Sequence, residues 1–141
     1  MVDKVIIRRK LIKISEYLQE LARLEDISYA EYVSDFRYKR SVERLIQLLV
    51  DVSVDINSHI LVDEGFASPQ DAFDSFIRAG QIGVLPSGFA EAIAPATGER
   101  NIIVHEYEGI DDALVYGSIK DTLKMFDEYR EYCLAFLAKR E

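Results

Sequence analysis

Four side chains suited to phosphodiester chemistry lie within eight consecutive residues. This octet runs from Arg100 to Tyr107 and also contains Asn101 and His105. Histidine can accept or donate a proton near neutral pH without the help of a metal. Arginine can hold a phosphate through two parallel hydrogen bonds and can stabilise charge that develops on it. These residue types favour phosphodiester cleavage, with Arg100, Asn101 and His105 as candidate catalytic residues.

The spacing of these residues fits the surface of a helix. At about 100° per residue, Arg100 and Tyr107 fall almost on one line. Asn101 and His105 form a second line, roughly 100–140° round from the first. The pair Ile102–Ile103 points the other way and is predicted to face a core. An amphipathic helix whose polar residues merely face water has the same pattern, so spacing alone leaves both interpretations open.

The separation of Arg100 from His105 also bears on the oligomeric state. The two residues are five positions apart, which places their side chains roughly 140° apart around a helix. One helix cannot easily bring both groups onto a single phosphate. A second copy of the chain, related by a two-fold axis, would supply the missing group. The spacing therefore predicts a homodimer with a shared active site.

The rest of the chain carries the apolar periodicity of amphipathic helices. Long stripes run over about residues 3–25, 34–64 and 112–139. Shorter helices are predicted after a capping box at Ser28, over 69–79 and from Pro86, and the octet is predicted to begin a fresh helical segment near residue 96. No segment shows the alternation of a β-strand. We therefore predict one all-α domain over residues 1–141, a bundle of three long helices and two or three short ones.

The composition restricts the classes of function. Of the 141 residues, 49% are apolar, and the net charge of −8 disfavours a general nucleic-acid binder. A local basic cleft remains compatible with that charge. No run approaches about 18 consecutive apolar residues, and the N-terminus does not resemble a signal peptide. A cytoplasmic protein with no membrane segment is expected.

Cofactor chemistry has little support in the sequence. The single cysteine, Cys133, leaves no partner for an internal disulfide and argues against a cysteine-based zinc site. It lies on the apolar stripe of the last helix, so it is predicted to be a core residue and not a nucleophile. No spacing typical of divalent metal ligands is present, and we predict neither a metal nor another cofactor.

Other polar residues of the long central helix are secondary candidates. Arg37, Arg40 and Arg44 recur at three and four residues and share one face. They could line a phosphate site in contact with a nucleic acid, or pair with acids on a neighbouring helix, and we favour pairing. The second histidine, His59, lies one residue from the buried stripe. A packed histidine that pairs with Asp55 is expected there, and not a catalytic one.

At the octet the sequence resembles the HEPN superfamily, whose mark is R-x4–6-H. More narrowly, it resembles the HepT-type ribonuclease toxins, whose pattern is R-N-x3-H-x-Y. The matching residues here are Arg100-Asn101-(Ile102-Ile103-Val104)-His105-Glu106-Tyr107. The resemblance covers nearly the full chain, including the segments 36–44 and 55–60, Leu85-Pro86 before the octet and Ile110-Asp111 after it.

This resemblance implies a dimerising helical bundle in which two copies of the motif build one composite cleft. It implies a metal-independent RNA endonuclease, the toxin of a HepT/MntA toxin–antitoxin pair. It also implies a protein partner, an MntA-type nucleotidyltransferase antitoxin that adds AMP to the motif tyrosine, here Tyr107. A bulky anionic adduct beside Arg100 would block the cleft.

A second class of function is compatible with the same residues. A non-catalytic helical adaptor could use the octet to dock a nucleotidyltransferase or a nucleotide, and the acidic net charge slightly favours that alternative. A purely structural dimeric bundle would leave the clustered Arg, Asn, His and Tyr unexplained.

Overall fold

The structure is a computed structural model that describes residues 2–140, and every regular element in that range is a helix. Three helices are long: α1 (Lys4–Ala22), α3 (Phe36–Asp63) and α8 (Ile119–Ala138). The predicted all-α class with three long helices is confirmed. The shorter elements are α2 (Tyr29–Ser34), α4 (Ala72–Gln81), α5 (Ser87–Ile93), α6 (Ala96–His105), the 3-10 turn η1 (Tyr107–Gly109) and α7 (Asp112–Gly117).

The expected two or three short helices are too few, because residues 2–140 contain five short α-helices and a 3-10 turn. The segment expected as one helix over 112–139 divides at Ser118, between α7 and α8. There the Ser118 hydroxyl donates to the Val115 carbonyl at 2.8 Å, a local bond that competes with regular helix. The helix expected over 69–79 begins at Ala72, because the Asp71 carboxylate caps it by accepting from the Asp74 backbone N–H at 2.7 Å.

Side-chain caps fix where several helices start. Ser28 and Glu31 form the predicted capping box of α2, in which the Ser28 hydroxyl accepts from the Glu31 N–H at 3.1 Å and the Glu31 carboxylate accepts from the Ser28 N–H at 3.2 Å. The Asp111 carboxylate caps α7 by accepting from the N–H groups of Ala113 and Leu114 at 3.0 and 3.3 Å. The connection that follows the octet therefore ends at a fixed point.

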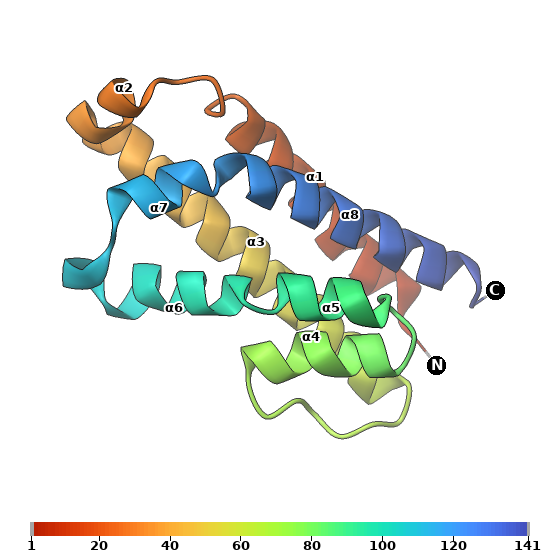
Figure 1. Cartoon of the computed structure of the whole chain (residues 1–141). Helices are drawn as coiled ribbons and strands as arrows, with labels where there is room; N and C mark the ends of the chain where they lie inside the picture. Colours follow the sequence, from red (N-terminus) through yellow and green to blue (C-terminus); the bar gives the residue numbers. More distant parts are fainter. Residues whose placement is uncertain (1, 141) are drawn as a thin grey trace.

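Helix α3 is central to the bundle, and it contacts α1, α2, α4, α6, α7 and α8 (Figure 1). Helix α1 also runs beside α8, and α4 packs against α5. Cys133 of α8 is fully buried, as predicted, and burial raises the pKa of its thiol to about 12. The core is built from apolar side chains that include Ile7 and Ile14 of α1, Ile46, Leu49 and Ile56 of α3, and Phe126 of α8.

A buried polar cluster joins α8, α3 and α4. The Tyr129 hydroxyl donates to Asn57 Oδ1 at 2.6 Å and lies 3.0 Å from the Ser53 carbonyl oxygen. The Asn57 amide in turn donates to the Ser75 hydroxyl at 3.2 Å. Burial raises the pKa of Tyr129 well above its usual value, so the hydroxyl stays a donor. Buried polar groups are costly unless they are paired, so this cluster holds the three helices in one register.

Helix α3 is long and apolar enough to cross a membrane by length and composition alone. That is weak evidence, because the core helix of a globular protein meets the same two criteria. Half of its most apolar window is buried inside the bundle, where its apolar stripe packs against neighbouring helices. We interpret α3 as the core helix of this domain.

Candidate active site

The octet occupies α6, η1 and the residue between them. Helix α6 begins at Ala96, which confirms the predicted start near residue 96, and it ends at His105. The Glu106 backbone N–H donates to the Ile102 carbonyl at 3.0 Å and closes the last turn. Helix α6 lies against α3 and α4, so the central helix supports the octet from one side.

Arg100 is held by an acid that sequence reasoning missed. Its Nε donates to Asp51 Oδ1 of α3 at 2.7 Å, and its Nη1 donates to Asn101 Oδ1 at 3.3 Å. The Arg100 side chain is 24% exposed and that of Asp51 is 39% exposed, so the pair lies at the rim of the α3–α6 contact. The only signal in the sequence is one carboxylate directly after the apolar run at Leu48–Val50. That signal does not identify its partner 49 positions away.

The other octet side chains are oriented differently. His105 is exposed, and no hydrogen bond or ion pair joins it to another side chain that the structure describes. Asn101 is exposed too, and contacts Arg100. The backbone of Tyr107 begins η1, whereas its side chain lies outside the described part of the structure. Within one chain, Arg100 is therefore directed to α3 and His105 remains open to solvent.

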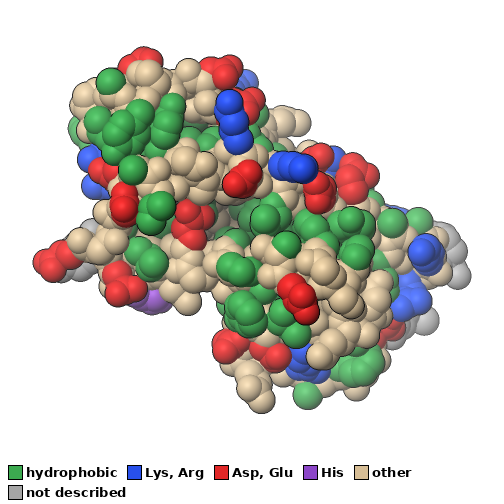
Figure 2. Space-filling view, in the orientation of Figure 1, with side chains coloured by type: hydrophobic (Ala, Val, Ile, Leu, Met, Phe, Trp, Pro, Cys, Tyr) green, Lys and Arg blue, Asp and Glu red, His purple; other side chains and the backbone are tan. Residues whose placement is uncertain are grey.

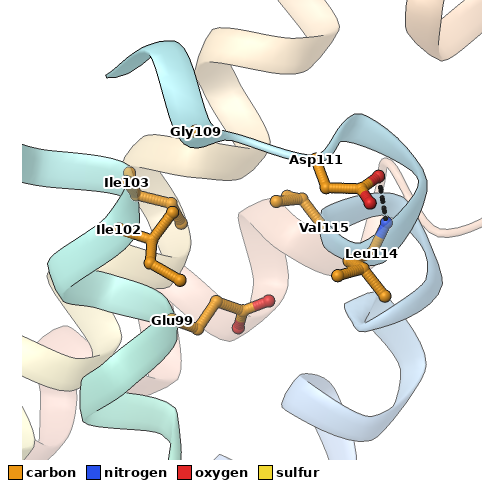
Figure 3. Close-up of a pocket in the computed structure, with 7 residues that line it drawn as sticks. All are labelled: Glu99, Ile102, Ile103, Gly109, Asp111, Leu114 and Val115. Carbon is orange, nitrogen blue, oxygen red and sulfur yellow. Dashed lines mark hydrogen bonds between the residues drawn. The ribbon is translucent and has the colours of Figure 1, made fainter. Parts of the chain in front are cut away.

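Ile102 and Ile103 were expected to face a core, and this expectation is wrong for Ile102. Ile102 is 41% exposed and Ile103 is half-buried. Both line a pocket of about 360 Å³ between α6, η1 and α7 (Figure 3). Apolar residues opposite the polar face of a helix can line a cavity as well as a core, and the sequence pattern is the same. The remaining lining residues are Glu99 of α6, Gly109 of η1, and Asp111, Leu114 and Val115 at the start of α7.

The pocket is lined mainly by aliphatic side chains and by two acidic ones, Glu99 and Asp111. Burial raises the pKa of Glu99, and a hydrogen bond with the Ser118 side chain partly opposes that shift. Asp111 is already engaged as the cap of α7. No lysine or arginine is among the described residues that line the pocket. Acidic side chains are also scattered over the face shown in Figure 2, in keeping with the net charge of −8.

The three arginines of the long helix are exposed, and two of them form local ion pairs. Arg37 contacts Asp35 at 2.7 Å, and Arg40 contacts the buried Glu43 at 2.8 Å. These partners belong to α3 or its cap, so the expected pairing with a neighbouring helix is wrong. The Arg37 guanidinium holds the pKa of Asp35 below its usual value. Arg44 has no ion pair with any described residue, which leaves it available to a ligand.

His59 behaves largely as predicted. Its Nε2 lies 3.7 Å from Asp55 Oδ1, and Lys10 of α1 also contacts that carboxylate. His59 is 39% exposed, so it is paired as expected but less packed than expected. Within residues 2–140, no group of three or more His, Cys, Asp or Glu residues is placed to hold a metal ion.

Comparisons with known proteins identify the family of the chain. Residues 14–133 match the family model described as Ribonuclease HepT-like. A tRNA nuclease HepT from Aphanizomenon flos-aquae is 35% identical over 140 residues, which is 99% of this chain and 95% of that protein. An mRNA nuclease HepT from Shewanella oneidensis is 25% identical over 100 residues, which is 71% of this chain and 75% of that protein.

Solved structures show the same fold. A tri-AMPylated Shewanella oneidensis HEPN toxin in complex with an MNT antitoxin has a TM-score of 0.84 and 24% identity, over 96% of this chain and 99% of that chain. A toxin–antitoxin complex with AMP-PNP has a TM-score of 0.85 and 22% identity, over 94% and 99%. The matches confirm the resemblance stated from the octet, and with it the prediction of a ribonuclease. The chain belongs to the ribonuclease HepT-like family.

Proposed function

We propose that this ribonuclease is a metal-independent RNA endonuclease and the toxin of a toxin–antitoxin pair in the cytoplasm. The observation that carries the proposal is the octet itself, with Arg100 held against α3 and His105 open to solvent. The 2′-hydroxyl of the RNA is the nucleophile. His105 removes its proton, the oxygen attacks phosphorus, and the bond to the 5′-oxygen breaks as that oxygen receives a proton. The products are a cyclic phosphate and a free 5′-hydroxyl.

Arg100 stabilises the charge that gathers on the phosphate during this step. Its contact with Asp51 uses Nε and leaves N–H groups of the guanidinium for phosphate oxygens. Asn101 either orients His105 or donates to a phosphate oxygen. The exposed Arg37, Arg40 and Arg44 are candidate contacts for more distant RNA phosphates, and Arg44 is the strongest of them because it has no ion pair among the described residues.

The active species is a homodimer. In one chain Arg100 is turned to α3 while His105 is exposed, so no single α6 presents both groups to one phosphate. Two α6 helices that meet across a two-fold axis would bring the Arg100 of one copy near the His105 of the other. Sedimentation should therefore give twice the chain mass, and a cleaving monomer would contradict the shared site.

Regulation is by a nucleotidyltransferase antitoxin, and an antitoxin is the partner named in the solved complexes. In the proposed reaction, the Tyr107 hydroxyl oxygen attacks the α-phosphorus of ATP. Pyrophosphate leaves, the phenolic proton passes to solvent, and Tyr107 carries AMP. Tyr107 is the last residue of the octet, so the adduct adds negative charge to the octet itself and competes with RNA.

RNA digestion in EDTA tests the nuclease. The parent should cleave, and His105→Ala and Arg100→Ala should lose at least about 100-fold in rate, the usual effect of removing an acid–base or charge-stabilising group. His59→Ala is the matched control, because it removes the only other histidine of the chain, which is half-buried and paired with Asp55. Equal rates for His105→Ala and the parent would remove His105 from the mechanism.

A further inference from the structure

The pocket between α6 and α7 is not used by the cleavage chemistry. Its α6 residues, Glu99, Ile102 and Ile103, form a face of the helix whose centre lies roughly 110° round from both Arg100 and His105. Figure 3 shows them facing Leu114 and residues around the start of α7 across an open space. Ile102 and Leu114 are 41% and 70% exposed, a poor environment for large aliphatic side chains in water.

The lining of this pocket suits a nucleobase better than a phosphate. Aliphatic walls on two sides pack well against the faces of a flat heteroaromatic ring. The carboxyl group of Glu99 can accept a hydrogen bond from the exocyclic amino group of adenine. Two carboxylates and no basic side chain among the described lining residues would repel a phosphate.

The position of the pocket also distinguishes two sources of a base. Gly109 lines it and lies two residues after Tyr107, in the same 3-10 turn. A nucleotide attached to Tyr107 is therefore tethered two positions along the chain from a residue that lines the pocket. An RNA base next to the scissile phosphate would start from the face of α6 that carries Arg100, roughly 110° round the helix from the pocket face. The geometry favours the tethered nucleotide.

We propose that the α6–α7 pocket receives the adenine base of a nucleotide added to Tyr107. This inference rests on the proposed modification of Tyr107. Docking of the base orders the adduct and holds it on the protein, which also shields its bond to the tyrosine. The pocket thus makes the modified, inactive state the more persistent one.

Methyl NMR on the full chain tests the occupant. Protein labelled at Ile, Leu and Val methyls is compared before and after treatment with antitoxin and ATP, and intact mass reports whether AMP is attached. Ring currents of adenine should shift the methyl signals of Ile102, Leu114 and Val115. The methyl signals of Val5 and Ile12, on the exposed surface of α1, should not shift.

The outcomes are separable. Unchanged mass means that the proposed modification fails, and the pocket proposal falls with it. An added AMP with unmoved pocket methyls overturns the pocket proposal alone. If the same methyls move when an oligoribonucleotide is added to unmodified protein, and not on AMP addition, the pocket holds an RNA base and the proposal is wrong.

A variant pair gives a second readout. Leu114→Ser removes one aliphatic wall of the pocket. Because the Leu114 side chain is 70% exposed, its loss should change the free energy of unfolding little. Phe36→Ser is the matched control, because Phe36 is 69% exposed and does not line the pocket. Each modified protein is treated with a phosphodiesterase, and release of AMP is timed. Release should be several-fold faster from Leu114→Ser than from the parent or the control, and equal rates would overturn the proposal.

Discussion

Replacement of Asp51 is the sharpest test of how the fold positions Arg100 for its proposed role in catalysis. The bond from Arg100 Nε to Asp51 Oδ1, at 2.7 Å, fixes a side chain that otherwise has about 2 kcal/mol of rotamer entropy to lose. If most of that loss falls between bound RNA and the transition state in the Asp51→Ala variant, the chemical step should slow about tenfold, since about 1.4 kcal/mol corresponds to a factor of ten. The pair is partly exposed, so the free energy of unfolding should fall by no more than about 1 kcal/mol.

The assay separates positioning from simple destabilisation. Single-turnover cleavage gives the rate of the chemical step, and titration of RNA gives the affinity. Asp51→Ala should lower the rate while RNA binds no worse, because a carboxylate near the phosphate has been removed. Asp51→Asn keeps an oxygen acceptor for Arg100 Nε and should recover part of the rate, although its neutral hydrogen bond is about half as strong. A rate for Asp51→Ala equal to or above the parent would refute the positioning role.

Three further predictions concern stability and reactivity. Tyr129→Phe should lower the free energy of unfolding by about 1–3 kcal/mol, measured by urea denaturation, because it leaves Asn57 Oδ1 buried and unpaired. Tyr132→Phe is the control, because the Tyr132 hydroxyl makes no hydrogen bond with the described residues, and equal losses would contradict the role of the cluster. Cys133 should resist iodoacetamide at pH 8 until the chain unfolds. Because its folded pKa, about 12, lies above the ordinary value of 9.0, its contribution to stability is complete below pH 9 and declines as pH rises from 9 towards 12. Glu99→Gln should raise the melting temperature slightly at pH 7 and have less effect at pH 4, because burial raises the pKa of Glu99 and disfavours its charged form.

Helix periodicity predicted most of the fold and little of its tertiary detail. The long helices and the capping box at Ser28 follow from local spacing, so they could be placed without any knowledge of the neighbours. The break at Ser118 could not, because the apolar stripe continues through it from Val115 to Ile119 and hides the change of direction. A periodic pattern reports which face of a segment is apolar, and it does not report whether the segment is one rigid helix.

The candidate site shows the same division. The octet could be identified from its residue types and from family resemblance, because both depend on residues that are close together in the sequence. Asp51 could not be paired with Arg100 from the sequence. It is one of 25 acidic residues, and nothing in its neighbouring positions indicates which basic residue it contacts. Ile102 was assigned to a core because hydrophobic pattern does not separate a core from the wall of a pocket.

The acidic net charge and the proposed RNA substrate are compatible because the relevant field is local. Physiological salt screens exposed charges beyond about 8 Å, so acids on remote faces have little influence on a bound phosphate. Asp51 does lie close, and it neutralises Arg100 while no RNA is bound. In the proposed homodimer, a second copy of the chain would add another Arg100 to the same cleft, and the exposed Arg44 of α3 would add a further positive charge. The proposed dimerisation would therefore add cationic charge at the cleft, as well as the second half of the proposed catalytic geometry.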